Sequence, residues 1–281
     1  MSVIIPTLNA SSTIGKLLSV LLDQDIDKQI IVVDSSSEDG TVEIVRKFGV
    51  EVIVIPRKAF DHGGTRNMAS LKAKGDILVF MTQDALPVGK TSLRKLITPL
   101  VDPVIAATFG RHIPRNDASP LETFARQFNY PEEGCVKGAR EIERFGIKTF
   151  FLSNVFSSFR RGPFLKVGMF PEGVRANEDM LMTAKLIIDG FKVAYVPEAM
   201  VIHSHRSSLL WQFKRYFNIG SSLKNCRWIL DYARHPEAEG MRMVKEQMRF
   251  VIKQHQYKWI PYILLESLAK YLGFRIGIFA G

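Results

Sequence analysis

The chain has 281 residues, of which 46% are apolar and 23% are charged, so wholesale disorder is excluded and the length suits one large domain or a domain with an appendage. Two cysteines, Cys135 and Cys226, exclude a disulfide scaffold and lack the paired spacing of a zinc site. The net charge of +10 is uneven, because residues 206–281 hold 13 Lys and Arg against 5 Asp and Glu. A basic end of this kind could meet nucleic acid, an anionic membrane or an acidic substrate.

Short apolar runs alternate with amphipathic helical patterns through the first two hundred residues. The opening MSVIIPTLN begins a strand at once and lacks the basic and apolar regions of a leader, which predicts no export signal and a cytoplasmic location. The alternation predicts an α/β fold whose largely parallel sheet is covered by helices on both faces. The expected strands are 3–5, 30–33, 52–55 and 77–80, and the expected helices are 14–22 and 42–48.

The pattern changes near residue 206, where the charge becomes basic and the apolar spacing becomes helical. Helical patterns cover 211–217, 243–252 and 259–279. We therefore predict a catalytic domain at 1–205 and a basic helical C-terminal region at 206–281.

Polar side chains follow several of the expected strands at the point where each strand ends. Thr7 and Asn9 follow the first strand, DSSSEDG begins at Asp34 after the second, and Thr82-Gln83-Asp84 follow the fourth. Any one of these groups could be a helix cap or a turn. Ligands of open α/β sheets bind beyond the carboxyl ends of the strands, so their repetition favours a binding site.

Two common phosphate-binding motifs are excluded by spacing. Gly89-Lys90-Thr91 resembles the end of a P-loop, but Asp84 stands where the first glycine is required. No G-x-G-x-x-G follows the first strand, which argues against a dinucleotide fold. Kinase and dehydrogenase functions are thereby disfavoured.

Several short strings occur together in an order that resembles one enzyme family. VIIPTLN, IVVDSSSEDGT, DHGGTRN, TQDALP, NED and VIHSH appear in the order seen in inverting glycosyltransferases of the GT-A fold, family two. DHGGTRN, TQDALP, FGRH-x-P and NYP are more similar to bacterial rhamnosyltransferases of that group. The resemblance implies transfer of a sugar, rhamnose from dTDP-rhamnose, onto a saccharide acceptor in cell-surface polysaccharide biosynthesis, with a dTDP- or UDP-linked donor.

The same resemblance implies a divalent cation, Mg²⁺ or Mn²⁺. GT-A enzymes hold the cation with a D-x-D motif after a strand, and here the motif reads Thr82-Gln83-Asp84, so Asp84 remains while a hydroxyl replaces the first carboxylate. One or two carboxylates with waters and phosphate oxygens can hold such an ion. His203 and His205 are further expected metal ligands, but alternate residues of a strand point to opposite faces, so we favour His203 alone.

Donor recognition is assigned by resemblance to the other strand-end loops. A nucleoside pocket is expected from Thr7, Asn9, Asp34 and Ser36, while Asp39 either joins it or caps the next helix. His62 contacts the donor sugar or has a structural role. Arg66 pairs with a phosphate, with Asp84 or with a neighbouring carboxylate. The remaining expected donor contacts are Gly63 and Gln83. Gly63 belongs to a Gly-Gly pair that permits close backbone approach, ahead of a helix that residues 65–67 are expected to open.

The catalytic base is expected in Asn177-Glu178-Asp179, ahead of a helix at 180–188. The resemblance makes Asp179 the base, with Glu178 supporting it or contacting the acceptor; the alternative is an acidic first helical turn stabilised by the macrodipole. Expected acceptor contacts are Ser153, Asn154 and Arg160, and Arg111, His112 and Tyr130 are expected near the sugar.

The C-terminal segment 257–281 is apolar but contains Glu266, Lys270 and Arg275, so we expect it not to cross a membrane. It either rests on an anionic inner leaflet as a basic amphipathic helix, or packs on the enzyme or a second subunit.

The sequence leaves two other functions open. One is a catalytically silent nucleotide-sugar or membrane-binding module; the other, nucleic-acid binding, is disfavoured because basicity is its sole support.

Overall fold

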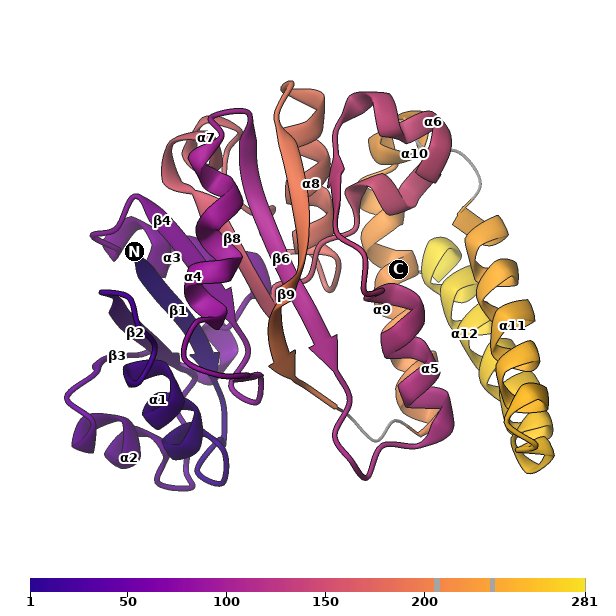
Figure 1. The fold of residues 1–281 in the computed structure, drawn as a ribbon, viewed down its shortest axis with the longest axis horizontal. Helices are drawn as coiled ribbons and strands as arrows, with labels where there is room; N and C mark the ends of the chain where they lie inside the picture. The colour runs from indigo at the N-terminus through magenta and orange to yellow at the C-terminus, as the bar shows by residue number, and fades with distance from the viewer. Residues whose placement is uncertain (205–207, 233–235, 281) are drawn as a thin grey trace.

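One mixed β-sheet forms the centre of the molecule (Figure 1), in a computed structural model that describes residues 1–204, 208–232 and 236–280. The strand order is β3-β2-β1-β4-β8-β6-β9-β5, and β7 pairs with β9 beside this path. The strands are β1 (Ser2–Thr7), β2 (Gln29–Asp34), β3 (Glu51–Val54), β4 (Ile77–Met81), β5 (Leu86–Pro87), β6 (Ile105–Ile113), β7 (Cys135–Lys137), β8 (Phe156–Arg160) and β9 (Lys192–Ile202).

The first four strands are parallel, and their side chains alternate between two apolar layers. Val3 and Ile5 join one buried cluster, while Ile4 between them joins the other. The first layer contains side chains of α1 (Ile14–Leu22), α2 (Thr41–Lys47) and α4 (Ser92–Ile97); the second contains side chains of α3 (His62–Lys72), α7 (Arg161–Lys166) and α8 (Glu178–Ile188). The predicted α/β fold is confirmed, and both faces are covered as expected.

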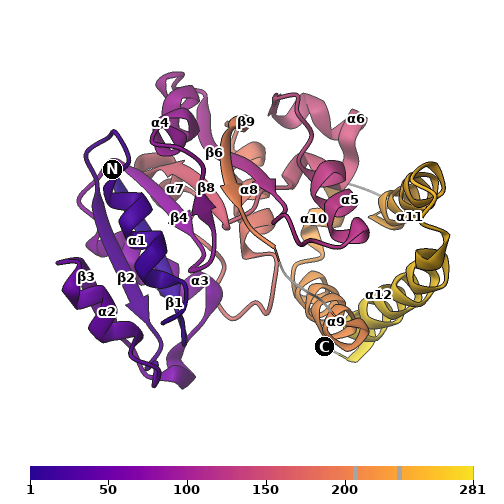
Figure 2. The same ribbon diagram turned by 60° about the horizontal axis from the view of Figure 1, so that its bottom comes forward.

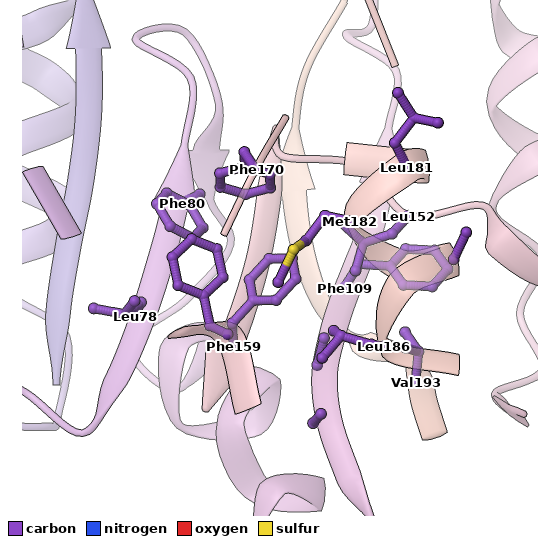
Figure 3. Packing of buried hydrophobic residues seen from close by; sticks show 14 of the residues in the cluster. Leu78, Phe80, Phe109, Leu152, Phe159, Phe170, Leu181, Met182, Leu186 and Val193 are labelled. Carbon is purple, nitrogen blue, oxygen red and sulfur yellow. The ribbon is translucent and has the colours of Figure 1, made fainter. Parts of the chain in front are cut away.

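The second half of the sheet is antiparallel at β8, which lies between β4 and β6. Phe80, Phe159, Phe164 and Phe170 pack ring against ring there, with centroids 5.0–5.8 Å apart. Figure 3 shows Phe80, Phe159 and Phe170 of this cluster. Each aromatic pair adds about 0.5–1.5 kcal/mol beyond the burial of its area. The cluster fixes β8 on β4, so the loop after Met81 lies beside the start of β8.

Two predicted helix starts are corrected. We expected residues 65–67 to open a helix, but α3 begins at His62, so Gly63 and Gly64 lie in its first turn. The helix expected from residue 180 begins at Glu178, which puts Asp179 in the first turn of α8.

The C-terminal helices pack on the sheet domain. Leu223 of α9 and Ile229 of α10 belong to the same buried cluster as Phe80, so the core crosses residue 205 and the predicted boundary stays a prediction. Leu121, Val251 and Ile263 join three further helices. The remaining α-helices are α5 (Pro120–Asn129), α6 (Ile142–Phe145), α9 (Leu209–Asn225), α10 (Trp228–Tyr232), α11 (Pro236–Lys253) and α12 (Ile260–Ala280).

Helix α12 lies along α9 with glycines at the contact (Figure 2). A Cβ built on Gly220 would stand 2.3 Å from the carbonyl oxygen of Phe274, and one on Gly277 would stand 2.1 Å from that of Phe217. The glycine spacing of α12 therefore serves packing within the chain. In the part of the chain that the structure describes, no helix is long and apolar enough to cross a membrane.

Candidate active site

The ends of β1, β2 and β4 bring three of the predicted donor residues together. Thr7 Oγ1 donates to Asp34 Oδ2 over 2.9 Å. Gln83 bridges to the loop after β1, because its Oε1 accepts from the amide of Leu8 at 2.8 Å and its Nε2 donates to the Leu8 carbonyl at 3.2 Å. Asp34 is fully buried and also accepts from the hydroxyl and amide of Ser37. Its carboxylate therefore organises the loop beneath the site.

A hollow of about 310 Å³ opens at this edge of the sheet. The Ser35 hydroxyl is buried there and has no hydrogen-bond partner among the described residues. An aromatic ring, a guanidinium and an unpaired hydroxyl around one hollow suit a nucleoside with its phosphate. The lining residues are Pro6, Thr7, Leu8, Ser35, Arg57, Phe60 and Gln83.

Arg57, Phe60 and Ser35 were missed at the sequence level. The signal available was position alone, because RKAF follows the third expected strand at the same edge. A larger hollow of about 550 Å³ lies between α1 and β2, at the opposite edge of the sheet, and we do not assign it to this site.

Asn9 and Ser36 are placed differently from the prediction. Both have positive φ, 48° and 57°, and neither lines the hollow. Asn9 Oδ1 accepts from the amide of Glu38, and Ser36 Oγ donates to the carbonyl of Ile55. Their side chains therefore hold adjoining loops together in the structure, and their nucleoside role stays a prediction.

Asp39 also joins loops, because its carboxylate accepts from the amides of Ser11 and Thr41. The N-cap of α2 is Gly40, so Asp39 stands one residue before the cap position that was one of its two expected roles.

Asp84 and His203 converge where β4 and β9 end. His203 Nε2 lies 3.5 Å from Asp84 Oδ2, and the His203 ring is buried. Two ligands in adjacent octahedral positions about 2.1 Å from Mg²⁺ stand about 3 Å apart, so the pair fits a shared cation. Thr82 Oγ1 is buried without a hydrogen-bond partner among the described residues, which leaves an oxygen available beside them. His205 lies outside the described residues.

The described residues hold no group of three or more His, Cys, Asp or Glu side chains suited to a metal. Asp84 and His203 would thus supply two ligands, and substrate phosphates and waters would supply the rest. Mg²⁺ is commonly bound in this way.

A second histidine stands behind His203. The His112 ring lies edge-on to His203, with centroids 5.6 Å apart, and stacks on Tyr130 at 3.9 Å. Burial, reinforced by His203 and Arg126, holds the pKa of His112 well below its usual range, so the ring is neutral. Arg126 Nη1 lies 3.4 Å from Nδ1, while Nε2 has no partner in the described part of the chain. If Nδ1 accepts from Arg126, then Nε2 carries the proton.

Asp179 occupies the first turn of α8 after Asn177, whose φ of 65° turns the chain inward. The amides of Asn154 and Met180 donate to the two oxygens of Asp179, at 3.2 and 2.8 Å. Burial, together with the negative charge of Glu178, raises the pKa of Asp179 to about 7. A carboxyl group with that pKa is suited to general-base catalysis near neutral pH.

Glu178 is buried beside this carboxyl group. Its Oε1 accepts from Arg66 Nη1 and from Asn154 Nδ2, each at 3.3 Å. Of the partners left open for Arg66, the structure therefore shows the neighbouring carboxylate. Glu178 is engaged in holding the base region together, which favours support over acceptor contact.

Of the two residues of DHGGTRN that were predicted near the donor sugar, Gly63 is packed within the chain and His62 lies beside the hollow. A Cβ on Gly63 would stand 2.1 Å from the carbonyl oxygen of Pro171, so the glycine is required for contact within the chain rather than with a donor. His62 is exposed and lies edge-on to the Phe60 ring at 4.9 Å, beside the hollow.

Ser153 and Asn154 lie in the site, but Arg160 does not. Ser153 is hydrogen-bonded to Tyr130, and Asn154 contacts Asp179 and Glu178. Arg160 pairs with Ile77 at the beginning of β4, and its Nη1 donates to the carbonyl of Pro103. Four residues of strand, about 13 Å, separate it from the edge that holds Asp84. Its predicted acceptor role is corrected accordingly.

Comparison with known proteins identifies the family of the chain. The family model for glycosyl transferase family 2 matches residues 2–168. The O-antigen chain rhamnosyltransferase RfbN of Salmonella typhimurium is 40% identical over 279 residues, which cover 98% of this chain and 88% of that one. The O-antigen chain rhamnosyltransferase WbaN of Salmonella anatum is 41% identical over 250 residues, covering 89% and 79%.

Solved structures share the fold at low sequence identity. A mannosyltransferase of Pyrobaculum calidifontis, in complex with GDP-Man and Mn²⁺, has a TM-score of 0.67 at 17% identity and covers 99% of this chain and 86% of its own. Staphylococcus aureus TarS 1–349 with UDP-GlcNAc has a TM-score of 0.59 at 17% identity, covering 99% and 90%. From its sequence and its fold, the chain belongs to glycosyl transferase family 2.

Proposed function

We propose that this enzyme transfers rhamnose from dTDP-rhamnose to a saccharide acceptor, with inversion at the anomeric carbon, in the synthesis of a cell-surface polysaccharide. Two relatives named O-antigen chain rhamnosyltransferases, aligned over most of the chain, support the choice of sugar. The observation that carries the reaction is the carboxyl group of Asp179, which has a pKa of about 7. Asp179 acts electrostatically on Tyr130, and Asp84, the partner of His203, acts on Arg126 beside that same tyrosine.

Asp179 acts as the general base. Its carboxylate removes the proton from the acceptor hydroxyl as the oxygen attacks the anomeric carbon, and the nucleoside diphosphate leaves from the opposite face. A single base on one side of the sugar gives inversion. Glu178, paired with Arg66, keeps the base region in place and helps to keep the pKa of Asp179 near the working pH.

Asp84 and His203 are the residues that would hold Mg²⁺ or Mn²⁺. The ion, when bound, neutralises the charge of the diphosphate leaving group. The hollow lined by Thr7, Phe60 and Gln83 takes the nucleoside. We further propose a lipid-linked saccharide as acceptor and a location at the inner face of the plasma membrane.

A donor panel tests this function. dTDP-rhamnose should raise the melting temperature more than UDP- or GDP-linked sugars, and the gain should grow with Mn²⁺. Asp84→Ala should weaken metal-dependent donor binding by at least about tenfold, since even outer-shell partners of a metal contribute that much. Asp23→Ala, an exposed carboxylate near the opposite edge, is the matched control. An equal metal-dependent gain in Asp84→Ala would remove the metal assignment, and donor binding without transfer would favour the silent module.

A further inference from the structure

Helix α12 presents a continuous apolar face to solvent. The side chains at i, i+4, i+8 and i+12 from Leu264 lie on one stripe, and a second leucine and a terminal phenylalanine widen it. Soluble monomers rarely expose contiguous apolar patches of more than a few hundred Å², and larger ones mark interaction sites. The face consists of Leu264, Leu265, Leu268, Leu272, Ile276 and Phe279, each 42–73% exposed.

The charge pattern of α12 is equally one-sided. Its acidic residue, Glu266, is buried against α9, where it accepts from Gln212 Nε2 at 2.8 Å and pairs with Lys270 at 3.0 Å. The glycine contacts keep this side of the helix on α9. The outward side therefore carries apolar side chains and the exposed Arg275, with no negative charge.

Cations surround the apolar face. Lys258 is exposed just before α12 begins, and Lys224 Nζ of α9 reaches the carbonyl of Phe279 near the end of the helix. Helix α11, which packs on α12, adds exposed Lys245 and Lys253, while its Arg242 and Arg249 are paired with Glu239 and Glu246 of the same helix. Apolar side chains flanked by cations are typical of helices that lie in the surface of an anionic bilayer.

We propose that the outer face of α12 docks on an anionic lipid bilayer, with the helix lying in the membrane surface. No described helix is suited to cross the bilayer, which is consistent with surface docking. A second copy of the chain fits this face less well than a bilayer does, because symmetric pairing would bring the cations of the two copies, such as Lys258 and Arg275, close together. The inference rests on this surface alone and holds whichever nucleotide sugar the enzyme uses.

The docking face lies close to the catalytic cleft. Gly273 of α12 touches the backbone of α9 at Phe213, and Arg215, two residues further, is near enough to Tyr130 and Arg126 to affect their pKa values. Helices α12 and α9 therefore both lie between the lipid and the site, a thickness of about 20 Å in all, since one helix with its side chains is about 10 Å across. An acceptor attached to a lipid could extend from the bilayer into the site over such a distance.

Flotation with lipid vesicles tests the proposal on the full chain. Wild type should float with vesicles of phosphatidylcholine and phosphatidylglycerol, and much less with phosphatidylcholine alone. The double variant Leu268→Asp with Leu272→Asp should partition at least about 30-fold less, because two inserted leucines are lost. Arg275→Gln should lower partition to the anionic vesicles about fivefold. Leu71→Asp with Val101→Asp, two exposed apolar residues elsewhere, should float like wild type.

Several results would overturn docking. These are equal flotation of wild type and the α12 double variant, indifference to phosphatidylglycerol, or a wild-type dimer in sedimentation velocity that the double variant dissolves while flotation is unchanged. Circular dichroism melting verifies that each variant is folded. Asp179→Asn should float like wild type, so a failure of the proposed reaction is distinguishable from a failure of docking.

Discussion

The proposed nucleoside side and base side of the site are built from different physical interactions. On the nucleoside side, Thr7, Asp34 and Gln83 are joined to one another or to backbone by short hydrogen bonds, and the hollow above them is already formed. On the base side, Asp179 and Glu178 are two acids beside one buried cation, Arg66. In the proposed enzyme, donor binding would thus rely on a shape set by the sheet, and chemistry on a carboxyl group whose pKa is displaced by its surroundings.

The largest expected effect belongs to the base. Asp179→Asn should lower kcat by about 10²- to 10⁴-fold while leaving the affinity for the nucleotide sugar within a few-fold, because the amide keeps the shape and cannot take the proton. In wild type, kcat/KM should rise as the pH increases through about 7, since Asp179 becomes a base as it loses its proton. Transfer assays and donor titration over a pH series measure both. Unchanged turnover in the variant would remove the assignment.

Glu178→Gln should have an intermediate effect of two kinds. The negative charge of Glu178 raises the pKa of Asp179, so its removal should shift the acid limb of the kcat/KM profile to lower pH. Arg66 would also lose its buried partner, which should cost about 3 kcal/mol in the free energy of unfolding. Denaturant titration and the pH profile measure these changes, with Glu43→Gln on the exposed face of α2 as control. A stable variant with an unshifted profile would contradict the coupling.

The smallest expected effect lies on the nucleoside side. Gln83→Ala removes two hydrogen bonds to the Leu8 backbone, each contributing about 1 kcal/mol, so the loop should loosen and the donor KM should rise by about tenfold. The value of kcat at saturating donor should stay within twofold or so, because no charge near the base changes. A fall in kcat as large as that of Asp179→Asn would erase the distinction between the two sides.

The parallel half of the sheet was predictable because its apolar runs and strand-end polar residues are local signals. Asp84 could be proposed in the same way, whereas Asp179 was assigned as the base through the resemblance to glycosyltransferase family two. The Arg66–Glu178 pair could not, because 112 residues separate its members and charge alone does not select a partner. Arg160 was assigned by resemblance, and no strand was predicted at 156–160 that would have placed it opposite the beginning of β4. Gly63 was assigned to a ligand because sequence does not show that Pro171 occupies the space.

The glycine contacts between α9 and α12 make the packing of α12 on the enzyme independent of the residues on its outer side. The inner side of α12 has no room for a Cβ at Gly273 or Gly277, so no larger residue can replace either glycine. The outer side chains, in contrast, are exposed and touch little of the enzyme. The exposed apolar residues of α12 could therefore be replaced by charged residues without moving Arg215 or the proposed catalytic groups. The membrane affinity of the enzyme could therefore be changed through α12 while the fold of the enzyme stays the same.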